Sequence, residues 1–125
     1  MDTYQKVLTW KERLSAAESA SRDGKRDRAE SLYRQAMDMS SGLSEQERVT
    51  SLIHLADFYA RNSDYEKAEP LYRQAAELYE RTFGPRNFIG AMCLRSLGEV
   101  LEALGKEAEA QTVKTRVTEI LGALS

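Results

Sequence analysis

The chain has 125 residues, among them 18 Lys and Arg, 20 Asp and Glu, one Cys and one His. This length, with 42% hydrophobic and 30% charged residues, is typical of one globular domain with its own core. One Cys and one His exclude an internal disulfide and a Cys/His zinc site within one chain. The net charge of −2 gives no reason to expect nucleic acid or an anionic membrane surface as a partner.

Charged residues near the N-terminus interrupt any run that resembles a signal peptide. No stretch of about 18 consecutive apolar residues occurs, as a membrane-spanning helix would need. We therefore expect a protein that does not contact a membrane and resides in the cytoplasm.

Six helical segments are predicted in chain order, separated by turn-forming residues at Asp23-Gly24, Ser41-Gly42, Asn62-Ser63, Gly84-Pro85 and Gly105. Each segment is rich in good helix formers, and its apolar residues recur at steps of three or four. Short links between amphipathic helices favour antiparallel neighbours. From first to last, the apolar stripes include Val7, Trp10 and Leu14; Ala29, Leu32 and Tyr33; Leu52, Leu55 and Ala56; Ala68, Leu71 and Tyr72; Leu94, Leu97 and Leu101; and Ala110, Val113 and Val117.

Two helix starts and one irregularity can be predicted from single residues. Ser44 and Glu47 have the spacing of a capping box, in which the serine accepts from a backbone N–H of the first turn. Asn87 is expected to cap the fifth helix. Pro70 lies inside the fourth segment, where it removes one backbone hydrogen bond, so we expect a bend or a loosened first turn there.

An internal repeat organises the chain. Residues 29–39 and 68–78 are identical at seven of eleven positions, at an offset of 39, and a more divergent copy begins at Ala110. Gly24, Ser63 and Gly105 occupy equivalent turns, five residues before Ala29, Ala68 and Ala110. Each copy is therefore a helix, a tight turn and a second helix. One such pair cannot bury its apolar face alone, so three pairs are expected to stack into a short solenoid.

These positions resemble the tetratricopeptide repeat (TPR) family over about residues 10–122. The resemblance implies an all-α, right-handed α-solenoid with three repeats over about 3–40, 44–82 and 87–122, in one domain spanning 1–125. The first repeat departs from the pattern at Arg13 and Ala16. The link at 81–86 and the run at 68–72 resemble the kinesin-light-chain type of repeat. The matching residues are Gly24, Ala29, Tyr33 and Ala36; Leu52, Leu55, Ala56, Tyr59, Tyr65, Ala68, Tyr72 and Ala75; and Leu94, Leu97, Gly98, Leu101, Gly105 and Ala110.

The sixth segment carries Lys114 where the earlier second helices carry Tyr33 and Tyr72. Polar residues surround that position, so its outer face is predicted to be exposed and to end the array. No equally clear cap is present at the N-terminal end.

Motifs for catalysis or cofactor binding, such as GxGxxG, HExxH and GxSxG, are absent from the sequence, so we expect no enzyme and no cofactor. His54 with Asp57 could be a base and its orienting carboxylate, but an exposed helix pair is favoured. Cys93 could be a reactive thiol, but a buried small hydrophobe is favoured. The basic run at 22–28 could meet an anion, but a solvated turn is favoured, and Trp10 fits the core better than an exposed binding hot spot.

The resemblance implies a concave face lined by the first helix of each pair, where TPR proteins commonly hold a peptide or a partner helix. The leading hypothesis is therefore a non-catalytic protein-binding module with a protein or peptide partner. The alternative is a structural subunit that self-associates through its end faces, and an enzyme centred on His54 is a third reading. Four basic and four acidic groups on the groove argue against a simple acidic or basic ligand, and Leu14, Ile53 and Met92 could form an apolar track. The groove candidates are Lys11, Leu14, Glu18, Arg22, Thr50, Ile53, His54, Asp57, Arg61, Met92, Arg95, Ser96, Glu99 and Glu102.

Overall fold

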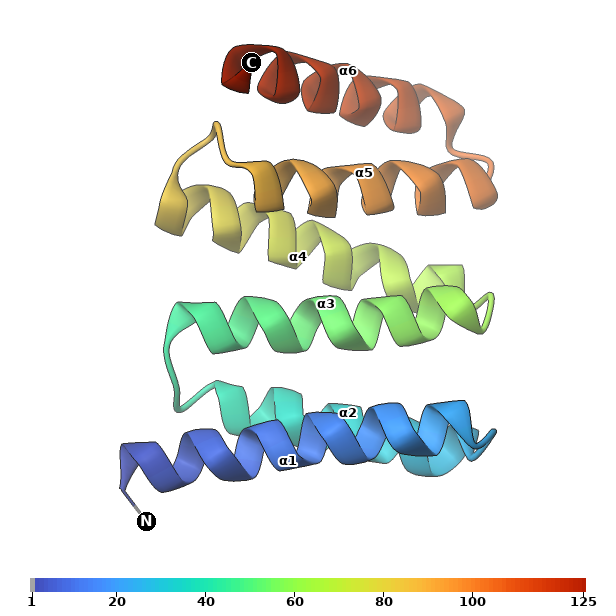
Figure 1. Cartoon of the computed structure of the whole chain (residues 1–125). Helices are drawn as coiled ribbons and strands as arrows, with labels where there is room; N and C mark the ends of the chain where they lie inside the picture. The colour runs from blue at the N-terminus through green and yellow to red at the C-terminus, as the bar shows by residue number, and fades with distance from the viewer. Residues whose placement is uncertain (1) are drawn as a thin grey trace.

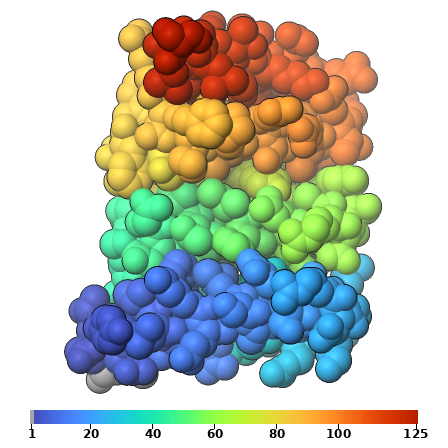
Figure 2. Space-filling model, in the orientation of Figure 1, coloured from blue at the N-terminus to red at the C-terminus, as the bar shows by residue number. Residues whose placement is uncertain are grey.

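The structure, a computed structural model, describes residues 2–125 as a stack of helices with no strand in that range. Successive helices run antiparallel and follow one another along the stack, from α1 and α2 at one end to α6 at the other (Figures 1 and 2). The predicted all-α solenoid built from three helix pairs is confirmed. None of the helices within residues 2–125 is long and apolar enough to cross a bilayer. The helices are α1 (Thr3–Arg22), α2 (Arg26–Ser40), α3 (Glu45–Arg61), α4 (Tyr65–Phe83), α5 (Phe88–Ala103) and α6 (Glu107–Leu124).

The three turns inside the helix pairs use the same left-handed backbone position. Gly24 and Gly105 have φ of 76° and 78°, and Ser63, at the equivalent place, has φ of 60°. Glycine adopts this conformation without steric cost, whereas a residue with a Cβ strains there. The turn therefore has the same left-handed conformation in all three repeats, and Ser63 adopts it although serine disfavours positive φ.

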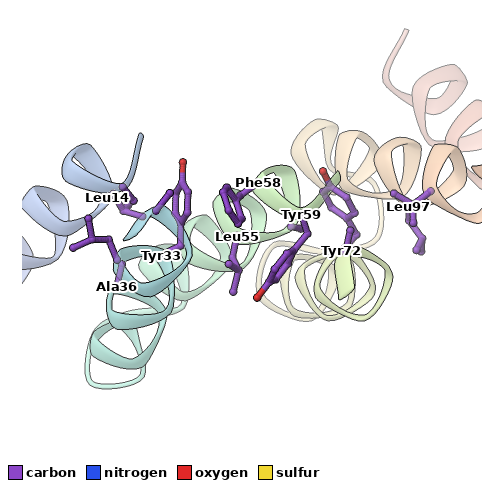
Figure 3. Close-up of a cluster of buried hydrophobic side chains, with 14 of the residues drawn as sticks. Leu14, Tyr33, Ala36, Leu55, Phe58, Tyr59, Tyr72 and Leu97 are labelled. Carbon is purple, nitrogen blue, oxygen red and sulfur yellow. The ribbon is translucent and has the colours of Figure 1, made fainter. Parts of the chain in front are cut away.

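Small alanines let the two helices of a pair approach closely, and aromatic rings fill the junctions between pairs. Ala29 and Ala68 on the second helices are completely buried. The Tyr33 ring of α2 packs on Phe58 of α3, with 5.3 Å between ring centroids. Figure 3 shows Tyr33, Phe58 and Tyr72 along one continuous cluster that reaches from α2 to α4. The core thus crosses the repeat boundaries, as stacking requires.

Trp10 is a core residue, which confirms the prediction made for it. Its ring is buried and its Nε1–H donates to the buried Ser51 hydroxyl on α3 at 2.7 Å. This bond ties the first repeat to the second and satisfies an indole N–H that would otherwise lack a partner away from water.

Both predicted helix starts are confirmed in position, but the capping hydrogen bond predicted for one of them does not form. Asn87 caps α5, and its Oδ1 accepts from the backbone N–H of Ile89 at 2.9 Å. Ser44 is the N-cap of α3, but its side chain makes no capping hydrogen bond. Its hydroxyl instead donates to the Glu47 carboxylate. A hydroxyl can donate as well as accept, and a charged acceptor makes the stronger bond.

Helix α4 continues through Pro70, whose side chain is exposed. The first turn retains its backbone bond from Ala68 N–H to the Asp64 carbonyl, at 3.1 Å. Proline is tolerated here because its ring points to solvent and only one backbone donor is lost. The bend expected at this residue stays a prediction.

Candidate functional site

The first helices of the three pairs, α1, α3 and α5, share one face of the stack, here called the inner-helix face. Two neighbouring hollows lie on it, and both are lined by Arg61 of α3. The hollow between α1 and α3 has a volume of about 340 Å³, and the hollow between α3 and α5 about 320 Å³. The first is lined by Glu18, Ser21, Arg22, Tyr33 and Arg61, and the second by Ala60, Arg61, Tyr65, Tyr72, Ser96, Glu99, Val100 and Ala103.

Two tyrosines at the same position of the repeat extend from the second helices to the inner-helix face. Tyr33 of α2 lines the first hollow and Tyr72 of α4 lines the second. Figure 3 shows both side chains pointing the same way, with their hydroxyls at the end of the ring nearest this face. The rings belong to the core, so the hydroxyls are held in place by packing rather than by loops.

Both tyrosines remain protonated, neutral side chains at ordinary pH. Burial, reinforced by the Asp57 carboxylate to which its hydroxyl donates, raises the pKa of Tyr72 far above its usual value. Burial also raises the pKa of Tyr33, and the nearby Arg61 guanidinium offsets only part of that rise. Each hollow therefore has a tyrosine O–H in its wall.

The structure pairs His54 and Asp57 with partners other than each other. His54 Nδ1 lies 3.1 Å from Glu18 on α1, while the Asp57 carboxylate accepts from the Tyr72 hydroxyl of α4. The expected pair on one helix is therefore wrong. Both side chains face the junctions with neighbouring repeats, where closer partners are available than one turn away on α3. This arrangement supports packing across repeats, and His54 lines neither hollow.

The charges on the inner-helix face are not equally available to a ligand. Every predicted acidic group has a partner within the chain, because Glu99 pairs with Arg95 at 3.8 Å and Glu102 pairs with Lys114, in addition to the contacts of Glu18 and Asp57. Three of the predicted basic side chains make no ion pair with any residue from 2 to 125, namely Lys11, Arg22 and Arg61. The even balance counted from the sequence therefore changes once contacts are considered.

The predicted apolar track is shorter than expected. Leu14 is buried in the same core cluster as Trp10, so its side chain is not offered to a ligand. Ile53 and Met92 are half-buried on the inner-helix face. Because α1 is the first helix of the stack, its apolar stripe turns toward α2 and α3 rather than toward the groove.

The hollows bring together five of the fourteen predicted groove residues, at the C-terminal halves of the first helices. Lys11, Thr50 and Met92 lie nearer the helix N-termini and line neither hollow. Ile53, Arg95 and Glu102 also line neither hollow. The five are Glu18, Arg22, Arg61, Ser96 and Glu99.

The prediction did not include Tyr33 and Tyr72, because only first helices were assigned to the groove. The signal was present in the sequence, since both tyrosines occupy the same place in the repeat. A side chain this long on the second helix can pass between two first helices and reach their outer face.

Cys93 is a buried core residue, as favoured from the sequence. Burial raises the pKa of its thiol to about 11. A thiol that stays protonated at neutral pH is a poor nucleophile, so this side chain contributes packing rather than reactivity.

Comparison with known proteins agrees with the geometry. A family model of the tetratricopeptide repeat matches residues 47–123, and a second matches residues 14–47. A search of curated proteins found no match.

Three solved structures are similar in fold. A putative kinesin light chain with TPR-like repeats from Podosopora anserina is 20% identical, with a TM-score of 0.79, covering 92% of this chain and 56% of that one. The TPR domain of Arabidopsis FLU is 14% identical, with a TM-score of 0.78, covering 98% and 99%. BtubC (BKLC) from P. vanneervenii is 20% identical, with a TM-score of 0.63, covering 95% and 65%. The chain thus spans little more than half of the kinesin light chain structure, and the TM-scores show a shared fold.

Proposed function

Because the chain belongs to the tetratricopeptide repeat family, whose domains generally act as protein–protein interaction modules, we propose that it binds a peptide or helix of a partner protein on its inner-helix face. The observation that carries this proposal is the pair of adjoining hollows that share Arg61. A bound segment crossing from α1 to α5 would meet both hollows in turn. The role proposed is non-catalytic.

The composition of the two hollows suits such a segment. Each combines charged side chains with the edge of a packed tyrosine ring, so it offers both hydrogen bonds and apolar contact. Arg61 lies between them beside the Tyr33 hydroxyl and has no ion-pair partner among residues 2–125, so its guanidinium has further N–H groups to donate to a ligand. Rigid helices hold these groups, which reduces the entropy lost on binding.

The proposal can be tested with peptides selected from a random library displayed on phage, using the full chain as bait. Arg61→Glu reverses a charge in both hollows, beside Glu18 in one and Glu99 in the other. We expect it to weaken the binding of the selected peptides tenfold or more, which is at least ~1.4 kcal/mol. Arg28→Glu is the matched control, because Arg28 is exposed on α2 and lines neither hollow. Fluorescence anisotropy gives both affinities. Peptides equally sensitive to the two substitutions, or insensitive to both, contradict a binding site at Arg61.

The alternative of self-association through the end faces has less support. At the first junction Tyr33 packs on Phe58, but the equivalent positions on the outward faces are Lys114 of α6 and Ser19 of α1. A copy stacked head to tail would therefore lose the aromatic contact that joins the repeats and bring an ammonium group against a polar helix. We expect light scattering to give the mass of a monomer over a range of protein concentrations.

A further inference from the structure

Exposed apolar side chains gather at the α4–α5 link. Phe83, the last residue of α4, is 46% exposed, and Phe88 and Ile89, the first two of α5, are 56% and 42% exposed. These three residues are here called the link patch. Leu124, 48% exposed, ends α6 at the same end of the molecule, where Figures 1 and 2 show the C-terminus beside the link. Clustered apolar exposure of this kind marks an interaction surface more often than scattered single residues do.

The repeat does not require this exposure. The α2–α3 link occupies the same place one repeat earlier, and its apolar residue Leu43 is half-buried against the core. The two phenylalanines that flank the α4–α5 link, by contrast, are 46% and 56% exposed. The difference therefore lies in these residues and not in the architecture.

The link patch is held in a defined conformation. Asn87 caps α5 immediately before Phe88, and Arg116 of α6 donates to the Pro85 carbonyl at 3.4 Å. The Phe83 ring packs on Tyr79, with 4.6 Å between centroids. A partner would thus meet a preformed surface and lose little entropy in ordering it.

Two unpaired arginines flank the link patch. Arg81 precedes it in the last turn of α4, and Arg86 lies within the link. Both are exposed, and neither forms an ion pair with another described residue, whereas Arg116 nearby pairs with Glu80 and Glu119. The patch therefore combines apolar side chains with positive charge that has no ion-pair partner among residues 2–125.

We propose that the link patch is a second docking surface, distinct from the inner-helix face, for a protein segment that carries a large apolar side chain next to carboxylates. The apolar side chain would cover Phe83, Phe88 and Ile89, and the carboxylates would accept from Arg81 and Arg86. A second copy of this chain is a poorer occupant, because a symmetric contact opposes like charges. An anionic membrane is also a poorer occupant, since lipid-binding clusters carry about four to eight basic residues and this surface has two free ones.

The test uses a random peptide library displayed on phage and panned against the full chain carrying Arg61→Glu, so that the result is independent of the inner-helix face. We expect selected peptides that pair a bulky apolar residue with Asp or Glu. The single substitution Phe88→Ser should weaken the binding of these peptides at least tenfold. The double substitution Arg81→Glu, Arg86→Glu should do the same. Tyr4→Ser, which removes an aromatic ring that is 74% exposed on α1, should leave them unchanged. Unchanged melting temperatures would show that the variants fold.

Several outcomes overturn this inference. The proposal fails if no selected peptide depends on Phe88, or if the dependent peptides lack acidic residues and ignore the arginine reversals. It also fails if Phe88→Ser abolishes self-association seen by light scattering, or binding to vesicles of phosphatidylserine and phosphatidylcholine, while no acidic peptide binds. If Arg61→Glu does not weaken peptide binding but Phe88→Ser does, the proposal for the link patch is retained. Only the proposed function of the inner-helix face is then refuted.

Discussion

The hydrogen bond from Trp10 to Ser51 should be a measurable part of the stability of this fold. Ser51→Ala removes the acceptor of a buried indole N–H that lies 2.7 Å from the serine oxygen. Leaving such a donor unsatisfied costs about 1–3 kcal/mol. Alanine recovers ~0.5 kcal/mol because it is the better helix former. The expected net loss is therefore about 0.5–2.5 kcal/mol.

This loss can be expressed as a change in melting temperature. Unfolding entropies of about 2.1 cal/mol/K per residue give roughly 0.26 kcal/mol/K for this chain. The net loss then corresponds to a decrease of about 2–10 °C, measurable by circular dichroism. Because Trp10 is the only tryptophan, its fluorescence reports on the same site during urea unfolding.

The matched control for this prediction is Ser19→Ala, a substitution at an exposed position of α1. It should be neutral or slightly stabilising, because it changes helix propensity without removing a buried acceptor. If Ser51→Ala behaves like this control, the indole N–H finds another partner and the reasoning from the single bond is refuted.

Three further predictions follow from the turns, the thiol and the core. Gly24→Ala and Gly105→Ala should each lower the free energy of unfolding by about 1 kcal/mol, since both have positive φ while an added Cβ would meet no atom within 4 Å; equal stability in urea titrations would contradict this. The Cys93 pKa of about 11 lies above the value of 9 for an unperturbed thiol, so ionisation favours the unfolded chain and stability should fall between pH 9 and 11. Cys93→Ala should flatten that fall, and parallel pH profiles for the two proteins would refute the assignment. Leu97→Ala, in the core, should cost about 2–5 kcal/mol, and a smaller loss by thermal melting would show that the site collapses around the cavity.

The inner-helix face shows how contacts revise a count of charges. The sequence predicts four basic and four acidic groups there, which reads as a neutral groove. In the structure the carboxylates of Glu18 and Asp57 are engaged by His54 and Tyr72, whereas Arg61 has no carboxylate partner among the residues described. These partners come from neighbouring helices, and a single sequence contains no direct signal for which of them is nearest.

The repeat was the most informative feature of the sequence. Helix positions, the glycine-type turns and the alanines that allow close packing all recur at offsets of 39 and 42 residues. Such local features depend on backbone conformation and side-chain size, which are properties of neighbouring residues along the chain. For that reason the all-α solenoid, the N-cap at Asn87 and the core placement of Trp10 and Cys93 could be predicted.

By itself, then, the sequence determined that the chain is a stack of three helix pairs, and the family resemblance assigned the first helices to one layer. Tertiary structure alone decided which side chains remain available on that layer. In the folded chain Leu14 is buried in the core, and Tyr33 and Tyr72 of the second helices line the two hollows. Phe83 and Phe88 remain exposed. The physical reason is that periodicity assigns a residue to a face of its own helix, whereas burial and pairing depend on the distance to side chains of other helices.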